Sequence, residues 1–318
     1  MNSLWASIKK GNTSSLAAAL GNTGIAIIKA IAASFSGSGA MFASAMHSVA
    51  DAINQTFVFV GSIFAERKPS ERFPTGFGRV INIVCMFAVI VVTVMAYETF
   101  HKGVELIKHP EESSDFWLNF IVLAISIIMD GSVLIKAMKE IVHESRSDAK
   151  GLGIFFASFR NAGKAAPPTR LVFYEDIVAT LGSLLALIAV FFATFSSFQL
   201  MDGIATILIA FLMVGVAFKV GYDNMAGLIG VAAPRDVEDR IGNLIFSHPE
   251  VSDITRMRII QEGRFYHVEA YIELKNGFSL AEATEINHKV RNTVLEDPHI
   301  ADVILGTLDD NGVVNWRR

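Results

Sequence analysis

Three polar side chains interrupt the apolar stretch Met41–Phe64. His47, Asp51 and Asn54 stand at positions i, i+4 and i+7, so they share one face of a helix with about 3.6 residues per turn. An ionisable residue in a membrane span costs roughly 2.5–3.5 kcal/mol on insertion scales. A neutral imidazole beside a carboxylate can hold a divalent metal such as zinc. We interpret this face as a metal or proton site; the alternative is a hydrogen bond that packs helices together.

The composition indicates a protein that crosses a membrane several times. The chain has 318 residues, 52% of them hydrophobic, and its mean hydropathy of +0.45 is well above that of a soluble domain. The single cysteine, Cys85, excludes a disulfide within the chain and a cysteine-rich metal site. No small-residue cleavage site follows the first apolar run, so we interpret that run as a retained span rather than a signal peptide.

Six segments have the roughly 20 apolar residues that a bilayer requires. We expect the spans at about 14–35, 40–64, 79–101, 116–138, 171–195 and 201–222. The links after the second and fourth spans are basic, as is the start of the chain with Lys9 and Lys10, and six spans put all three on one side. By the positive-inside rule that side is cytoplasmic. We therefore expect both termini in the cytoplasm, and the lack of a long leader favours a bacterial inner membrane.

The fifth span carries two acidic residues near its start. Glu175 and Asp176 are adjacent, so they point about 100° apart on a helix, and Asp176 shares a face with Thr180 and Ser183. We expect Asp176 to be a metal ligand, whereas Glu175 is either a ligand or a solvated side chain at the cytoplasmic mouth. Asp51 lies near the middle of its span and Asp176 only a few residues into its own. The two meet only if the fifth helix begins outside the membrane or the cavity opens to the cytoplasm.

Two further charged residues lie inside expected spans. Lys29 is in the first span, on one face with Asn22, and Asp130 is near the middle of the fourth. Either residue can take an auxiliary or proton-coupling role. The alternatives are that Lys29 and Asp130 form a structural pair, or that Lys29 extends its ammonium group to the interface.

From about Val231 the chain has the composition of a soluble domain. Hydrophobic periodicity there predicts an α-β-β-α-β order, with elements at 236–246, 254–261, 265–274, 279–296 and 302–308. Ser279 and Glu282 have the spacing of a capping box at the start of the second helix. This order predicts a small α+β sandwich with helices on one side of a sheet. We therefore expect two domains, 1–230 in the membrane and 231–318 in the cytoplasm.

Several stretches resemble the cation diffusion facilitator family of divalent-metal/proton antiporters. They are GSGAMFASAMHSVADAINQ in the second span, KPSERFPTGFGR in the following link, GVELIKHP after the third span, YEDIVATLG in the fifth and MDGIATILIAFLMVGVAFKVGYDNMAGLIG in the sixth. The tail looks like the family's ferredoxin- or metallochaperone-like cytoplasmic domain. The resemblance covers residues from about 14 to 309. The pattern is most similar to the iron/zinc-type branch that includes zinc transporter nine.

The resemblance implies a transport site with two ligands from the second span and two from the fifth. His47, Asp51 and Asp176 match three of these positions. The fourth, one turn before Asp176, is Val172, which cannot bind a metal. The remaining candidates for the fourth ligand are Glu175, Asn54, a main-chain oxygen and a water. A site richer in oxygen favours Fe²⁺, Mn²⁺ or Co²⁺ beside Zn²⁺.

We therefore expect efflux of a divalent cation, with zinc the best candidate, by exchange for protons. We expect no enzymatic activity, because neither HExxH nor GxSxG occurs, no cofactor beyond the transported cation and no nucleic-acid partner. The resemblance implies a homodimer formed through the tail. Family positions that often carry metal-binding histidines are here Ser252, Tyr271, Ile286 and Gly306, so we expect no binuclear metal site there. The alternative function is a membrane metal sensor or assembly factor that binds metal without transporting it.

Overall fold

The computed structural model describes most of the chain. The described residues are 13–65, 67, 70–110, 115–145, 147, 149–162, 167–195, 200–262 and 265–316; Lys9 and Lys10 lie outside them. They divide into two compact units. The first unit contains the long helices as far as Asn224, and the second combines the segment Ala65–Asn82 with the elements that follow Met225.

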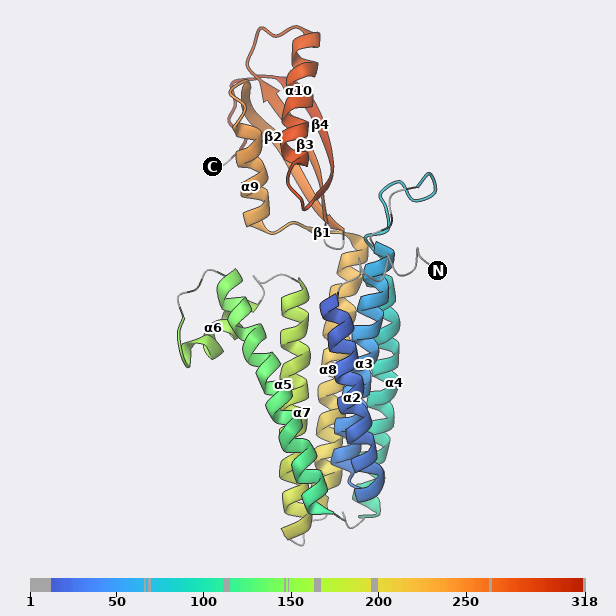
Figure 1. Ribbon diagram of the computed structural model, residues 1–318. Helices are drawn as coiled ribbons and strands as arrows, with labels where there is room; N and C mark the ends of the chain where they lie inside the picture. Colours follow the sequence, from blue (N-terminus) through green and yellow to red (C-terminus); the bar gives the residue numbers. More distant parts are fainter. Residues whose placement is uncertain are drawn as a thin grey trace. The chain divides into compact units, whose positions relative to one another are not determined.

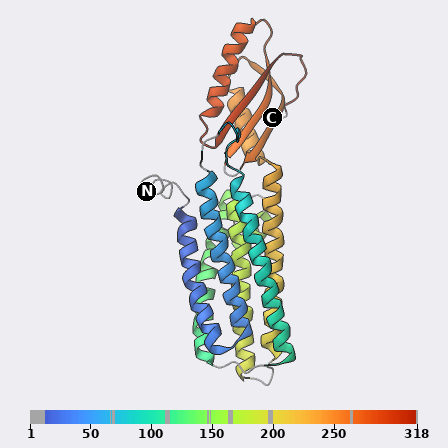
Figure 2. The same cartoon turned by 90° about the vertical axis from the view of Figure 1, so that its right-hand side faces the viewer.

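Six helices among the described residues are long and apolar enough to cross a membrane, as predicted. They lie side by side in Figures 1 and 2. Their bounds are α2 Thr13–Ser36, α3 Gly39–Ala65, α4 Val80–Lys108, α5 Phe116–Glu144, α7 Pro167–Phe195 and α8 Leu200–Ile229. The chain is therefore a multi-pass membrane protein with six spans, followed by a small mixed α+β domain.

Several of these helices run past the expected spans. α4 continues to Lys108 instead of ending near residue 101, α5 continues to Glu144, and α8 continues to Ile229. Hydropathy marks only the part of a helix that suits lipid, whereas the backbone hydrogen bonds continue into the polar region. A further short helix, α6 (Gly153–Asn161), lies in the basic link before α7, where we predicted no element.

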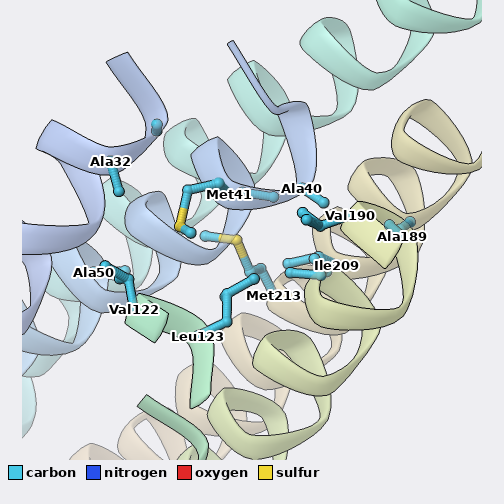
Figure 3. Packing of buried hydrophobic residues seen from close by; sticks show 14 of the residues in the cluster. Ala32, Ala40, Met41, Ala50, Val122, Leu123, Ala189, Val190, Ile209 and Met213 are labelled. Carbon is cyan, nitrogen blue, oxygen red and sulfur yellow. The ribbon is translucent and has the colours of Figure 1, made fainter. Parts of the chain in front are cut away.

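Small side chains let the membrane helices of the first unit pack closely. Figure 3 shows Met41 and Met213 pointing toward each other, with Leu123 and Ile209 beside them. The alanines of the same cluster are Ala32, Ala33, Ala40, Ala43, Ala50, Ala96, Ala186, Ala189 and Ala205. Lipid tails are as apolar as leucine, so helices in a bilayer associate mainly through close packing between small residues.

The closest approach of this kind joins α4 to α8. A Cβ atom on Gly103 would lie 3.1 Å from the carbonyl oxygen of Gly203, and one on Gly203 would lie 3.0 Å from that of Gly103. Neither backbone can retreat from such a contact without separating the helices. The two glycines therefore hold α4 and α8 together as a pair.

The second unit contains a four-stranded sheet of order β1-β2-β3-β4. Its elements are β1 Val231–Ala232, α9 Arg235–Phe246, β2 Val251–Glu262, β3 Phe265–Leu274, α10 Leu280–Leu295 and β4 Ile300–Asp309. β2 and β3 pair antiparallel. β3 and β4 pair parallel, and the chain between them forms α10. The predicted α-β-β-α-β order is confirmed; β1, only two residues long, is too short for a hydrophobic period to predict.

Apolar residues of α9 and α10 pack on the sheet, among them Ile241 and Val290, which are fully buried. The predicted capping box at the start of α10 is present: the Ser279 hydroxyl accepts from the Glu282 backbone N–H at 3.3 Å, and the Glu282 carboxylate accepts from the Ser279 backbone N–H at 2.8 Å. The capping box could be predicted from the sequence because it depends only on two residues three positions apart.

A buried carboxylate fixes the connection between α2 and α3. Asp202, in the first turn of α8, accepts hydrogen bonds from the backbone N–H groups of Gly39 at 2.7 Å and Ala40 at 2.9 Å, and from the Ser38 hydroxyl at 3.1 Å. The start of α3 thus receives its cap from a helix 160 residues away in sequence. A carboxylate is favoured there because the N–H groups of a first turn lack intrahelical partners.

Replacement of this cap should destabilise the membrane unit. We expect Asp202→Ala to cost roughly 2–3 kcal/mol, because three hydrogen bonds to a charged acceptor are lost and two buried N–H groups are orphaned. The melting temperature of the detergent-solubilised protein should fall by roughly 4–8 °C. The matched control is Asp223→Ala on the same helix. Asp223 forms a partly exposed pair with Lys219 at 2.6 Å, a class worth about 0–1 kcal/mol. Equal losses in the two variants would contradict the assignment.

Candidate metal centre

α3 presents its three polar side chains on one face inside the first unit. His47 and Asn54 are buried and Asp51 is partly buried. The His47 Nε2 atom lies 3.5 Å from Asp51 Oδ2. This contact follows from the i, i+4 spacing, because residues one turn apart are neighbours on the same face of a helix. We call these three residues the polar face of α3.

α7 lies antiparallel to α3 and contacts the polar face. The Ser44 and Ser183 hydroxyl oxygens are 3.5 Å apart. Farther along, the Asn54 amide donates a short hydrogen bond to Glu175, and the Gln55 amide reaches the other oxygen of Glu175 at 3.5 Å. Glu175 is therefore level with Asn54, and the residues that follow it on α7 are level with Asp51.

The structure brings the two acidic residues Asp51 and Asp176 to nearby levels of their helices. α7 begins at Pro167, so Asp176 lies between two and three turns from its beginning. The bond between Asn54 and Glu175 sets the neighbouring Asp176 close to the level of Asp51.

A small cavity opens beside the polar face. Its volume, counted as the space open to the centre of a water-sized sphere, is about 10 Å³. This is roughly enough for one water or one ion. His47, Asp51, Asn54 and Glu175 line one side of it. We call the opposite side the apolar wall; α4 and α8 form it with Ala88, Val89, Val92, Met213, Val216, Ala217 and Val220. A cation in this cavity would meet ligands from α3 and α7 only.

Glu175 and Asp176 have exchanged their expected places in this structure. Glu175, the second candidate, lines the cavity and bonds to Asn54, whereas Asp176, the expected ligand, does not line it. Asp176 nevertheless interacts electrostatically with Asp51. Val172 packs against the apolar cluster around Phe173, so it contributes nothing to the cavity.

Four buried polar atoms near the α3–α7 contact lack hydrogen-bond partners among the described residues: His47 Nε2, Asn54 Oδ1, Asp176 Oδ2 and Thr180 Oγ1. Buried polar atoms are satisfied in the large majority of cases. An imidazole nitrogen together with amide, carboxylate and hydroxyl oxygens is a donor set that suits zinc and other divalent cations. The residues present therefore fit a cation.

The described residues nevertheless contain no three His, Cys, Asp or Glu side chains close enough to hold one ion together. His47 and Asp51 lie next to each other on α3. The acidic residues of α7 are too far from this pair to complete a metal site with it. A metal bound by both helices would require Asp176 or Glu175 to move toward Asp51. Sequence patterns could identify each residue, but not this spacing between helices.

Lys29 and Asp130 lie next to the polar face. Lys29 is only 1% exposed; its ammonium donates to Ser48 at 2.9 Å and to Ser183 at 3.4 Å, and lies 3.9 Å from Asp130 Oδ2. Of the alternatives left open by the sequence, the structure thus contains the ion pair. The two serines that complete it, like Gln55 beside Glu175, were not singled out as partners, because a hydroxyl group carries no periodic signal of its own.

Comparison with known proteins agrees with this architecture. A family model described as the cation efflux transmembrane domain matches residues 15–229, and one described as the cation efflux protein cytoplasmic domain matches residues 233–305. The cation-efflux pump FieF of Shewanella oneidensis is 21% identical over 279 residues, which are 88% of this chain and 86% of the relative.

Two other relatives are named as the mitochondrial proton-coupled zinc antiporter SLC30A9. That of Xenopus laevis is 28% identical over 236 residues, 74% of this chain and 41% of the relative; that of Homo sapiens is 25% identical over 221 residues, 69% and 38%. The chain thus matches about two fifths of the length of these antiporters. All three relatives are transporters by name, which separates the chain from enzymes. The match over residues 15–229, more than half of the chain, shows that this protein belongs to the cation efflux family.

Proposed function

We propose that this protein moves a divalent metal cation, with Zn²⁺ the best fit, across a membrane in exchange for protons. The observation that carries the proposal is the set of orphaned polar atoms on α3 and α7, beside a cavity with room for one ion. The names of the SLC30A9 relatives support the metal and the proton coupling. An oxygen-rich donor set leaves Fe²⁺, Mn²⁺ and Co²⁺ as further substrates.

His47 and Asp51 form the permanent part of the proposed site, because they share one helix face and already lie side by side. Asp176 supplies the third ligand and Glu175 the fourth, in place of Val172. Asn54 holds Glu175 at the edge of the cavity until the ion arrives. Metal ligands must be deprotonated, so binding of the metal releases protons. On the far side of the membrane, protons compete with the metal for the same ligands and displace it.

The two sides of the cavity suit alternating access. Metal ligands lie only on α3 and α7, while α4 and α8 offer a smooth apolar wall. The glycine contact makes α4 and α8 a pair. Tilting of this pair against the polar face, about the end where Asp202 holds the start of α3, breaks no bond to the cation. It opens the site toward one side at a time, the general mechanism of such transporters.

We further propose a homodimer in a bacterial inner membrane, with both termini in the cytoplasm and no cofactor beyond the transported cation. The name of the model that matches residues 233–305, ZT_dimer, supports the dimer. The homologous pump FieF, which is bacterial, supports the membrane. The basic links after α3 and α5 support the orientation.

Lys29 and Asp130 keep a fixed charge beside the site. An ammonium group has three N–H donors, and Lys29 has three oxygen partners in Ser48, Ser183 and Asp130, so the protonated form is fully accommodated. The pair holds Asp130 away from the metal ligands. The positive charge also repels the incoming cation, which keeps binding weak enough for release.

Loss of Asp51 should abolish transport. In proteoliposomes with an imposed pH gradient, we expect Asp51→Asn to reduce Zn²⁺ uptake to that of empty vesicles, because the amide keeps the shape of the side chain but removes the charged ligand. The control is Asp223→Asn on α8, which should transport like the wild type. Full transport by a correctly inserted Asp51→Asn protein would contradict the site. Zn²⁺ binding without any flux in the wild type would instead support a metal sensor or assembly factor.

Glu175 should act as a ligand and not only as a partner of Asn54. We expect Glu175→Gln to weaken Zn²⁺ binding at least about tenfold, since even the loss of a supporting group typically costs 10–100-fold. Calorimetry on the purified protein measures the dissociation constant. The matched control is Glu98→Gln on α4, where the side chain is exposed. An unchanged dissociation constant in Glu175→Gln would leave Glu175 with a packing role.

Removal of the Lys29 charge should tighten binding while slowing turnover. We expect Lys29→Met to lower the dissociation constant for Zn²⁺ at least about tenfold, because a like charge near a divalent ion is costly at low dielectric. Asp130→Asn should have the opposite effect, because Lys29 is then uncompensated. The double variant should lie closer to the wild type than either single variant. Weaker binding in a well-assembled Lys29→Met protein would show that the lysine is structural only.

A further inference from the structure

The short helix α6 has one face docked on the membrane unit. Ile154 and Ala162 pack against the apolar cluster that contains Met138 and Phe173. The rings of Phe159 and Phe173 meet edge-on at 5.2 Å between centroids. Phe173 lies in the second turn of α7, which begins at Pro167. α6 therefore touches the first turns of α7, beside the neighbouring end of α5 (Figure 1).

The surface of α6 away from the docked contacts is exposed and aromatic, and Phe159 lies at its edge. Phe155 is 47% exposed, Phe156 73% and Phe159 48%, and Leu152 just before the helix is 88% exposed. Phe155 contacts both other rings, at 5.4 Å and 5.0 Å between centroids. In a helix the positions 154 and 158 lie on the docked side and 156 lies on the far side, with 155 and 159 between them. An aromatic face of this kind would be costly in water.

The segment that contains α6 is basic from residue 149 onward, after Asp148. Residues 149–170 include Lys150, Arg160, Lys164 and Arg170 and no Asp or Glu. Lys150 and Arg160 are exposed. A helix with aromatic residues on one face, basic residues beside them and low overall hydrophobicity is typical of segments that lie in the surface of a bilayer. Anionic lipid headgroups attract such basic residues by about 1 kcal/mol each near the surface.

We propose that α6 lies in the headgroup region of the bilayer at this end of the spans. Phe155 and Phe156 insert below the phosphates, and Lys150 and Arg160 bind anionic headgroups. The contact with Phe173 sets the depth of α6 in the bilayer. The positive charge of Lys150 and Arg160 favours anionic lipids. This surface anchors the α5 and α7 ends next to the acidic residues of α7. The proposal is independent of which ion is transported.

Spin labels can measure the depth of α6, because the chain has a single cysteine, which is buried. In a Cys85→Ser background, labels are attached at Phe156→Cys and, as a second position, at Leu152→Cys. Ile128→Cys on α5, 71% exposed within a span, is the lipid reference. Lys275→Cys, exposed in the second unit, is the water reference. The proteins are reconstituted in vesicles of phosphatidylcholine and phosphatidylglycerol at about 3:1.

We expect labels at 152 and 156 to collide with oxygen more than with a water-soluble nickel chelate, with ratios between those of the two references. Collision ratios equal to that of position 275 would overturn the proposal. Spin–spin broadening of the spectra that disappears when labelled protein is diluted with unlabelled protein would also overturn the proposal. It would show that α6 contacts a second copy of the chain instead.

The charge requirement has its own test. Vesicles without phosphatidylglycerol should shift the label at 156 toward water, and the Lys150→Gln/Arg160→Gln variant should show that shallower position even with phosphatidylglycerol present. A depth that responds to neither change would overturn the binding of anionic lipid.

Discussion

Every polar group that this chain takes into the membrane must find a partner there, because lipid supplies none. Most of the buried groups do. Asp202 accepts three hydrogen bonds at the start of α3, and Lys29 is surrounded by three oxygen atoms. Against this background the atoms of His47 and Asp176 that lack hydrogen-bond partners are conspicuous, and they are the observation on which the proposed metal site rests.

The packing of the helices serves the same constraint. Polar side chains can satisfy each other across helices only when the backbones come close, and alanine and glycine make this possible. The contact between Ser44 and Ser183 brings α7 against α3 where both helices carry small residues. The Gly103–Gly203 contact holds α4 to α8. Within the first unit, a polar α3–α7 contact therefore faces the apolar wall formed by α4 and α8.

Local patterns could be predicted from the sequence, and spatial relations could not. The i, i+4 spacing of His47 and Asp51 and the capping box of Ser279 depend on one helix each, so the residues alone reveal them. The choice between Glu175 and Asp176 depends on the rotation of α7 against α3, which hydropathy does not record because the two residues are adjacent. The partners of Lys29 come from three other helices. α6 escaped prediction because its apolar residues are too few to resemble a span.

The proposed transport site looks incomplete, and the cavity offers a physical reason for this. If His47, Asp51, Asp176 and Glu175 already formed a tight cluster, the three carboxylates would repel one another without an ion, and the cluster would hold an ion too firmly. Here Glu175 is hydrogen-bonded to Asn54, and the Lys29 side chain lies nearby. In the proposed mechanism the ion draws the acidic residues of α7 toward α3, so its binding energy is partly spent on moving helices. That coupling between ligand closure and helix position is what an alternating-access mechanism needs, and a preformed metal site would lack it.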